Sequence, residues 1–402
     1  MLCQVTISNY KCFRDSFTLD LQATNISEHE DSLLTNGDEE KFLPLSVIYG
    51  PNGSGKSTVL EAIFALICKI MRPICAVSCG NEQCGKMDDS FLIVPYKFRP
   101  NYKSQPTQYE LFFRTNIAEY QYNIEFIEDK IINECLNKKR LDGKRYTSVF
   151  SRNERRIDLK GSLKSYTCSD ISDNLSLLSY LGITHRRNST IKDIIKWFEN
   201  GIHYLNYGNP FRESRITVND PLKPIILKML KEMDIDISNY RVEDKNKKIE
   251  VFTQHEVNSD TYDLNLTEES SGTIKLFGIL HYIVDSLKTG ATLMIDELDA
   301  KMHPVLLKYI VKLFTDSEIN KKNAQLIFTS HDLSLMDNSI LRRDEIWFTA
   351  KGDEQNSMLY SLVEIKMAGA TERKDGKYSK RYLEGKYGAD PYLKKIINWE
   401  EI

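Results

Sequence analysis

A glycine-rich loop between two apolar patterns of different period constrains this chain more than any other feature. Residues 50–57 read G-P-N-G-S-G-K-S and directly follow the short apolar run L-S-V-I-Y at 45–49. After the loop, apolar residues recur at helical spacing, at Val59, Leu60, Ile63, Phe64 and Leu66. A strand, a G-x-x-x-x-G-K-[ST] loop and a helix in this order form the P-loop pattern, whose backbone N–H groups and helix N-terminus bind phosphate.

The P-loop predicts that the chain binds a nucleoside triphosphate, ATP, together with Mg²⁺. Lys56 would neutralise phosphate charge, and the hydroxyl of Ser57 would hold the metal ion. The predicted ATP-binding residues are Asn52, Gly53, Ser54, Gly55, Lys56, Ser57 and Thr58.

Composition indicates a soluble globular protein, because 41% of the 402 residues are hydrophobic and 28% are charged. The net charge of −3 gives no overall attraction to nucleic acid or to an anionic membrane. No apolar run is long enough for a membrane span, and the first residues lack the apolar region of a signal peptide. The eight cysteines have no disulfide-framework spacing, which favours reduced thiols and a cytoplasmic location.

Downstream, the run L-M-I-D-E at 293–297 is an apolar strand that ends in two acids, the Walker B pattern. Asp296 would position Mg²⁺, and Glu297 would polarise the attacking water as general base. A third apolar strand, at 326–329, ends in Ser330 and His331. Since it follows Walker B, we interpret His331 as a switch histidine that contacts the γ-phosphate and the attacking water.

The stretch E-E-S-S-G-T at 268–273 opens an apolar helical pattern shortly before Walker B. Ser270, Ser271 and Gly272 stand where ABC-class ATPases carry their signature motif. In that class the signature reaches the γ-phosphate held by the other subunit, so this interpretation implies a head-to-tail dimer with two nucleotides between its subunits. The alternative is an ordinary serine N-cap after an acidic approach.

The order of these motifs resembles compact ABC-class ATPases related to RecF, the SMC heads and the OLD-family proteins. The chain is most similar to AAA/ABC ATPases of bacterial anti-phage and abortive-infection systems, of the RloA, AbiL and PARIS ATPase-subunit type. Four stretches carry that narrower resemblance: I-S-N-Y-K-C-F at the start, E-S-S-G-T, R-R-D-E-I-W-F at 342–348, and K-R-Y-L-E-G-K-Y-G-A-D-P-Y at 380–392. Two departures are a missing second signature glycine and no clear Q-loop glutamine, with Gln105 and Gln108 as weak candidates.

The expected fold class is α/β: an ABC-type P-loop ATPase head with a mixed α/β insertion lobe. No apolar heptads persist between the P-loop and the signature, so a long coiled coil is excluded. We expect residues 1–72 and 249–348 to form the two parts of the head, 73–248 the insertion lobe and 349–402 a C-terminal tail.

Local patterns predict individual elements of this fold. Helices are expected after the P-loop to about Arg72 and within 170–205 and 221–238. Strands are expected at 2–7, 16–22, 91–94, 108–115, 119–127, 249–254 and 261–266, the first two as a hairpin.

Three features outside the motifs have two interpretations each. Cys75, Cys79 and Cys84 could belong to a zinc site, but an over-long spacing and the lack of a fourth ligand favour an ordinary insertion. Basic runs at 138–145, 152–156 and 245–248 could follow a nucleic-acid backbone or be solvated loops. The aromatic and basic tail at 381–392 suits a partner interface, and equally packing onto its own domain.

Two functions compete. The first is an ATPase subunit of a phage-defence system, which acts as a nucleotide-gated sensor and scaffold for a separate effector, a nuclease or other toxin. The segment after Arg343 lacks the D-x-D acids of a Toprim nuclease, so the effector would be another polypeptide. The alternative is a RecF-like DNA-repair ATPase that clamps duplex DNA. A transporter subunit fits the signature and the insertion poorly.

Overall fold

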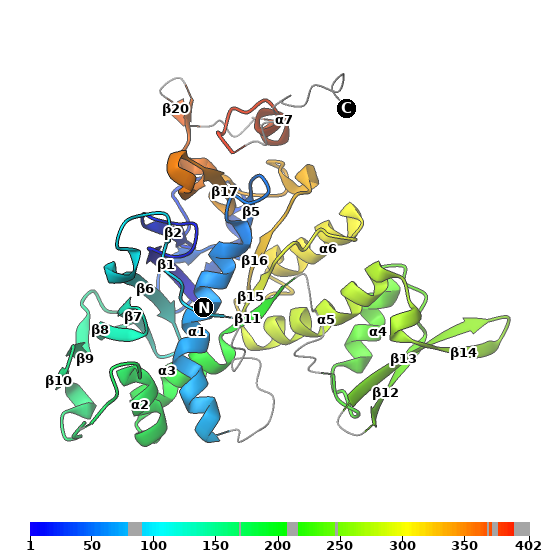
Figure 1. Ribbon diagram of the computed structural model, residues 1–402. Coiled ribbons are helices and arrows are strands. Elements are labelled where there is room, and N and C mark those ends of the chain that lie inside the picture. Colours follow the sequence, from blue (N-terminus) through cyan, green and yellow to red (C-terminus); the bar gives the residue numbers. More distant parts are fainter. Residues whose placement is uncertain are drawn as a thin grey trace, which may run out of the picture.

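A six-stranded, mostly parallel sheet forms the centre of the protein (Figure 1). The computed structural model describes residues 1–78, 91–168, 170–206, 216–245, 248–367, 370–371 and 377–389. The strand order is β11-β15-β16-β5-β17-β18, and only β18 runs antiparallel to its neighbour. The strands are β5 (Leu45–Tyr49), β11 (Ile202–Leu205), β15 (Thr292–Ile295), β16 (Gln325–Thr329), β17 (Ile346–Lys351) and β18 (Ser357–Ser361).

Both faces of this sheet are buried, and neighbouring residues of one strand belong to two different cores. Ile48 and Ile327 pack into the core on one face, whereas Val47, Leu326 and Phe328 pack into the core on the other. Side chains alternate across a strand, so a parallel sheet covered on both faces needs continuous apolar runs. This requirement explains the uninterrupted apolar runs that flank the P-loop and Walker B motifs.

Helices cover the two faces of the central sheet. Helices α1 (Lys56–Ser78), α2 (Leu177–Thr184) and α3 (Ser189–Asn200) contribute to the first core. Helices α4 (Lys223–Glu232), α5 (Ser271–Thr289), α6 (Pro304–Thr315) and α7 (Tyr378–Leu383) contribute to the second. Among the described residues the longest helix is α1, with 23 residues, so that part of the chain holds no long coiled coil.

A seven-stranded antiparallel sheet lies against α1–α3 in the first core, in the order β10-β9-β8-β7-β6-β1-β2. Its strands are β1 (Leu2–Ser8), β2 (Phe17–Asp20), β6 (Thr107–Arg114), β7 (Ala118–Ile127), β8 (Lys130–Arg140), β9 (Thr147–Asn153) and β10 (Arg156–Leu159). Two short strand pairs are β3 (Leu34–Thr35) with β4 (Lys41–Phe42), and β19 (Lys366–Met367) with β20 (Ala370–Thr371).

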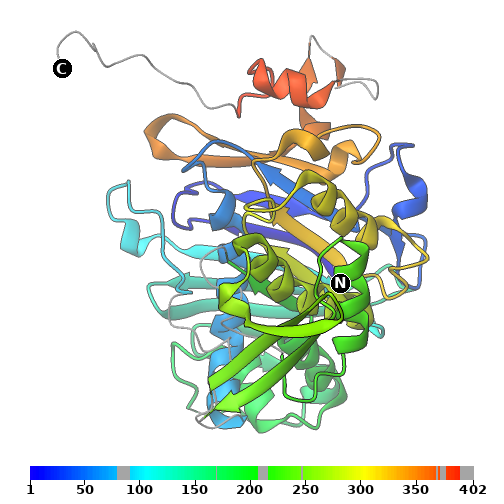
Figure 2. The same ribbon diagram turned by 90° about the vertical axis from the view of Figure 1, so that its right-hand side faces the viewer.

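A separate three-stranded meander projects from the second core, and it faces the viewer in Figure 2. It consists of β12 (Asn239–Lys245), β13 (Lys248–Val257) and β14 (Asp260–Asn265). Tyr240 and Thr253 are fully buried against the body of the protein, whereas every residue of β14 except Asn265 is exposed. The meander is therefore attached at one end and free at the other.

The structure confirms the α/β class and most expected elements; it also contains elements that were not expected, among them β12, β17, β18 and α6, and it differs locally in the following places. Residues 91–94 form no strand, although they are apolar. The P-loop helix continues past Arg72 to Ser78 with Pro73 inside it. The span 170–205 holds two short helices and then β11, and β8–β10 were not expected. Strand formation needs a hydrogen-bonding partner distant in sequence, which apolar content alone does not reveal.

The sheets also cross the expected boundaries at 72/73 and 248/249. Strands β6–β10 extend the sheet of the N-terminal hairpin β1–β2, and β11 pairs with the Walker B strand β15. The span 73–248 thus supplies strands to both sheets and, with β12, one strand to the meander. The division into four ranges stays a prediction.

The segment R-R-D-E before β17 is a buried ionic junction. Arg342 donates to Asp344 at 2.9 and 2.8 Å, and Arg343 pairs with Glu28 at 2.9 Å. Glu345 is 1% exposed and accepts a hydrogen bond from the backbone N–H of Arg342, while its Oε1 is buried without a partner in the described part of the chain. Burial, with Asp344 and Glu28 nearby, raises the pKa of Glu345 to about 8.

We expect Glu345→Gln to stabilise the protein at alkaline pH. The folded state holds the proton of Glu345 more tightly than the unfolded state, so stability is lost as pH rises from about 4.5 towards about 8. An amide removes this loss, which amounts to a few kcal/mol at ~1.4 kcal/mol per pKa unit. Thermal denaturation at pH 5 and pH 8.5 would show a gain confined to the higher pH. The exposed control Glu318→Gln should show none, and an equal change at both pH values would contradict the assignment.

Candidate functional site

The carboxyl ends of three adjacent parallel strands bring the predicted motifs together. The order β15-β16-β5 places Walker B, the histidine strand and the P-loop side by side at one edge of the sheet. Ligand sites of open parallel sheets lie at this edge. The folding of the strands therefore assembles one site from residues far apart in sequence.

The P-loop connects β5 to α1 and is fixed by its own backbone and by β17. A Cβ on Gly50 would lie 2.4 Å from the carbonyl oxygen of Thr349, and Gly50 has φ +149°, so only glycine fits. The hydroxyls of Ser54 and Thr349 are 2.6 Å apart, which ties the loop to β17. No sequence pattern indicated this role of Thr349.

Lys56 lies inside the loop rather than in solvent. Its Nζ donates to the carbonyls of Gly50 at 2.9 Å and Pro51 at 3.3 Å, and the residue is 7% exposed. Burial lowers the pKa of Lys56, and the nearby carboxylates of Asp296 and Glu297 act in the opposite direction. A cation held over inward-turned backbone suits an anionic ligand.

Asp296, after β15, connects the start of α1 to β16 through one carboxylate oxygen. Its Oδ1 accepts hydrogen bonds from the hydroxyls of Ser57 at 2.9 Å and Thr329 at 2.6 Å. The Thr329 hydroxyl in turn accepts from the backbone N–H of Glu297 at 2.7 Å. Thr329 was not among the predicted site residues, although it lies in the T-S-H-D stretch.

This donor set fits Mg²⁺. The ion takes hard oxygen ligands, usually one or two protein groups together with substrate phosphates and water. Ser57 and Asp296 supply a hydroxyl and a carboxylate 2.9 Å apart at the mouth of the P-loop. Within the described residues no cluster of three or more His, Cys, Asp or Glu side chains could bind a metal alone, so the phosphates would have to complete the site.

The two predicted catalytic side chains extend from the same edge. Glu297 has φ +50°, a left-handed conformation that costs a non-glycine residue about 1 kcal/mol. His331 is exposed, and its backbone N–H donates to Asp299 at 3.1 Å. Neither the Glu297 carboxylate nor the His331 ring makes a hydrogen bond among the described residues, so both remain available to a ligand.

The predicted signature begins α5, and its local contacts are those of a helix cap. The Ser270 hydroxyl accepts from the backbone N–H of Thr273 at 3.1 Å, and Ser271 is exposed. A Cβ on Gly272 would lie 2.8 Å from the carbonyl oxygen of Lys301, in the turn after Walker B. Capping and a role in trans are compatible, because the cap uses one hydroxyl and leaves the helix N-terminus open.

Lys275, which sequence reasoning missed, connects the signature to Walker B. Its Nζ donates to the carbonyls of Glu297, Leu298 and Ala300 at 2.5, 3.1 and 2.9 Å. Burial lowers the pKa of Lys275 to about 8. Lys275 thus positions the turn that carries Glu297, and a lysine one helical turn after a signature serine was the only signal in the sequence.

Residues 45–337 match a protein-family model described as "AAA domain, putative AbiEii toxin, Type IV TA system". The match spans the P-loop, the signature, Walker B and His331. The chain belongs to this family. It is therefore an AAA-type P-loop ATPase. No curated protein has a sequence detectably similar to this chain.

Solved structures with a similar arrangement include heads of SMC proteins. One is an SMC head bound to the C-terminal winged-helix domain of ScpA, with 12% identity, a TM-score of 0.47, and coverage of 90% of this chain and 97% of that one. Another is the SMC head domain from Thermotoga maritima, with 14% identity, a TM-score of 0.43, and coverage of 91% and 99%. Similarity at this level identifies no substrate or partner for this chain.

Two residues of the basic runs have structural roles in this family member. Lys139 lies on β8, and its Nζ is 2.8 Å from Glu119 and 3.5 Å from Glu40. Arg152, on β9, is buried and donates to the carbonyls of Glu154 and Leu175 at 2.8 and 2.7 Å. Neither side chain is free to bind a phosphate. Residues 138–140 and 152–153 lie in strands, whereas 141–146 and 154–155 form turns or loop, so the loop alternative holds only for part of these runs. Residues 246–247 of the third run lie outside the described residues.

The other open alternatives are decided in part. Residues 377–389 of the tail pack onto the head. The ring of Tyr382 stacks on that of Phe348, with 5.6 Å between ring centroids, and also contacts Tyr49. Tyr392 lies outside the described residues.

The zinc alternative stays open. Cys75 is buried in α1, whereas Cys79 and Cys84 lie outside the described residues. The side-chain amide of Gln108 donates to Glu125 at 3.1 Å.

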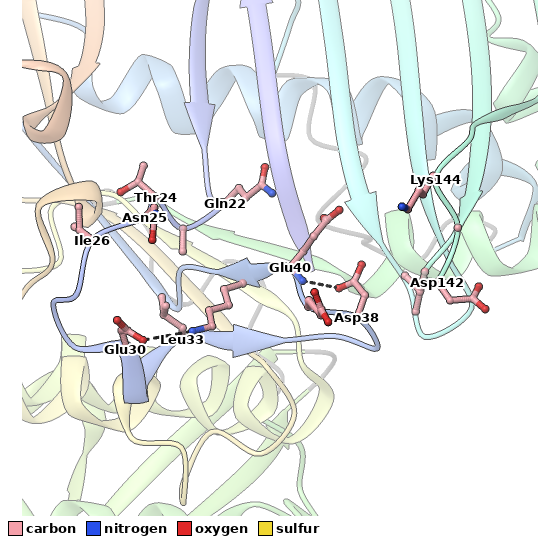
Figure 3. Close-up of a pocket in the computed structure, with 15 residues that line it drawn as sticks. Gln22, Thr24, Asn25, Ile26, Glu30, Leu33, Asp38, Glu40, Asp142 and Lys144 are labelled. Atoms are coloured by element: carbon pink, nitrogen blue, oxygen red, sulfur yellow. Dashed lines mark hydrogen bonds and ion pairs between the residues drawn. The ribbon is translucent and has the colours of Figure 1, made fainter.

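Some features belong to no predicted motif. A cavity of about 660 Å³ lies between the loop after β2 and the β8–β9 turn (Figure 3). Its charged residues include both signs, and Glu30 pairs with Lys41 at 3.5 Å. No residue of the nucleotide site lines it.

Among the helices in the described residues, none is long and apolar enough to cross a bilayer.

Proposed function

We propose that this chain hydrolyses ATP as the nucleotide-gated subunit of a bacterial anti-phage defence system and controls a separate effector protein. The observation that carries the catalytic part is the hydrogen-bonded cluster in which Asp296 accepts from Ser57 and from Thr329. This cluster joins P-loop, Walker B and histidine strand into one unit, which is the arrangement that phosphoryl transfer needs for positioning and charge stabilisation.

Each residue has a defined part in the proposed reaction. The P-loop and Lys56 bind the phosphates, and Ser57 and Asp296 hold Mg²⁺, which would neutralise charge on the phosphate oxygens. Glu297 accepts the proton of the attacking water, and His331 donates a hydrogen bond to the γ-phosphate. Thr329 and Lys275 hold Glu297 through its backbone, from opposite sides of the turn.

The proposed site is completed by a second copy of the chain. Gly272 of the predicted signature lies next to Lys301, in the turn after Walker B. The exposed helix N-terminus at Ser271 offers backbone N–H groups to an anion. In a head-to-tail dimer each signature would face the γ-phosphate on the partner's P-loop, so that ATP closes the dimer and hydrolysis opens it.

The defence role rests on the resemblance of four sequence stretches and on the family description, which names a toxin–antitoxin system. The alternative function is a clamp on duplex DNA. Lys139 and Arg152 cannot serve it as phosphate contacts, because both side chains are bonded within the protein. We therefore favour a protein effector as partner.

The purified chain should hydrolyse ATP slowly and cut no nucleic acid, because its described residues hold no acidic cluster of the kind that two-metal nucleases use. Expressed with its genomic neighbours, the tagged chain should co-purify with one neighbour-encoded protein and release it during phage infection. The tagged Lys56→Ala variant is the control for nucleotide dependence. Metal-dependent cleavage of DNA or RNA by the chain alone would refute a separate effector.

A further inference from the structure

One face of the β12–β14 meander is buried at the attached end and exposed to solvent at the free end. Cross-strand pairing puts Thr253 opposite Leu264, His255 opposite Tyr262 and Val257 opposite Asp260, so these residues share one face. Thr253 is fully buried on this face, but Val257 is 50% exposed, Tyr262 53% and Leu264 38%. Apolar side chains on an uncovered sheet face favour contact with another surface.

The part of β13 that leads to this free end is hydrogen-bonded to the residue before the predicted signature. Thr253 Oγ1 and His255 Nε2 lie 2.5 and 2.8 Å from the same carboxylate oxygen of Glu269, the residue before Ser270. Thr253 and His255 therefore connect β13 to the start of α5, and the hairpin end begins two residues beyond His255. A partner surface that contacts the signature would therefore have the hairpin end beside that contact.

The hairpin end is also acidic. Residues 254–269 contain no Lys or Arg and carry Glu256, Asp260, Asp263, Glu268 and Glu269. Asp263 pairs with Arg241, and Glu268 caps the backbone of Asn265. Glu256 and Asp260 are exposed and form no ion pair with the described residues. We call Glu256, Val257, Asp260 and Tyr262 the hairpin patch; Val257, Asp260 and Tyr262 share one face, and Glu256, opposite Thr261, lies on the other face at the same end of the hairpin.

A surface of opposite charge lies beside the P-loop. Residues 91–104 contain no acid, and Phe98 is 69% exposed and Leu92 53%. Lys97 and Lys103 are exposed and likewise have no ion pair in the described part of the chain. We call Leu92, Lys97, Phe98 and Lys103 the loop patch.

The loop patch is held in place next to the nucleotide site. The backbone N–H of Tyr96 donates to Asn9 at 3.0 Å, and the backbone N–H of Lys11 donates to the carbonyl of Val94 at 2.8 Å. The loop around residue 11 contacts the P-loop in turn, since a Cβ on Gly55 would lie 3.0 Å from the ring of Phe13. The loop patch therefore has a fixed place relative to the P-loop.

The two patches lie on opposite sides of one molecule. In Figure 1 the β13–β14 hairpin projects on the right, and residues 91–104, in cyan, lie on the left. They cannot meet within one chain. A head-to-tail dimer, however, brings the signature side of each copy against the P-loop side of the other.

We propose that the hairpin patch of one copy docks on the loop patch of a second copy, beside each of the two nucleotides. This inference rests on the proposed head-to-tail dimer. Each patch offers two exposed apolar side chains and two unpaired charges, with opposite signs on the two patches. Twofold symmetry forms the contact twice, so it both strengthens closure and restricts pairing to copies of this chain.

Charge reversal tests the contact. We expect Glu256→Lys/Asp260→Lys and, separately, Lys97→Glu/Lys103→Glu to weaken nucleotide-dependent dimerisation at low salt by about 10-fold or more, because like charges then face each other. Mass photometry with a non-hydrolysable ATP analogue measures the dimer. An equal mixture of the two variants should recover wild-type dimerisation, because both contacts of the heterodimer again join opposite charges.

Controls separate this inference from the proposed function. Glu154→Lys/Asp158→Lys, on the exposed β9–β10 hairpin, should leave dimerisation unchanged. If the wild type itself does not dimerise with the analogue, the proposed dimer fails. If it does and both reversals dimerise as well as it, the docking contact alone is refuted. Reversals that dimerise normally but lose a co-purifying effector would assign the hairpin to that effector and also refute the contact. Should a reversal not fold, Tyr262→Ser and Phe98→Ser replace it, with the same expected loss.

Discussion

Glu297→Gln should leave ATP binding intact and slow hydrolysis by about 10²–10⁴-fold, the usual contribution of a general base. The amide keeps the shape of the side chain and cannot accept a proton from water. The backbone contacts of Glu297 with Thr329 and Lys275 do not involve the carboxylate, so the turn should keep its conformation. Because ATP then persists, the variant should accumulate as a closed dimer.

Phosphate release and nucleotide-binding titrations measure the two effects separately. Asp299→Asn is a comparison at the same edge, since Asp299 binds the backbone N–H of His331 and should affect turnover less. Hydrolysis by Glu297→Gln at the wild-type rate would show that another group activates the water.

Lys56→Ala and Ser271→Asp should each abolish ATP hydrolysis, and a heterodimer of the two should regain about half of the wild-type activity, since one of its two composite sites is intact. Loss of Lys56 removes a buried cation from the phosphates and should weaken ATP binding by about 30-fold or more, a cost of at least ~2 kcal/mol. The aspartate would place a carboxylate against the partner's γ-phosphate, a like-charge contact.

The structure favours Ser271 over Gly272 for this test, because any side chain at Gly272 would collide with the backbone of Lys301. An acid at the first position of α5 favours the helix dipole, so the fold should tolerate it. Ser189→Asp, at the same position of α3, is the matched control and should remain active. An inactive heterodimer, with its formation verified by two affinity tags, would refute sites shared between subunits.

Several features of the protein could be read from local sequence. The P-loop and Walker B strands were predictable because a parallel sheet buried on both faces requires continuous apolar runs, and the phosphate loop requires glycine at Gly50. Strands β6 and β7 were predictable because one face of each packs into the core and apolar residues alternate along them. The strand predicted at residues 91–94 was wrong, because an apolar run forms a strand only where a partner strand is available to pair with it.

Other features depended on contacts between distant parts of the chain. The role of Thr329 follows from the position of β16 between β15 and β5, and the role of Lys275 from the approach of α5 to the Walker B turn. The basic pattern of β8 and β9 suggested solvated loops, yet Lys139 meets Glu119 and Glu40 only when three segments fold together.

The sequence by itself determined which residues can bind a nucleotide, since loop conformation, charge and metal affinity are local properties of a few adjacent side chains. The tertiary structure alone decided which side chains hold those residues in place, how the span 73–248 is shared between two sheets, and where the acidic hairpin and the basic loop lie. These depend on strand order and on burial, which are set by the whole chain, because a hydrogen bond or an ion pair between distant segments leaves no periodic trace in either of them.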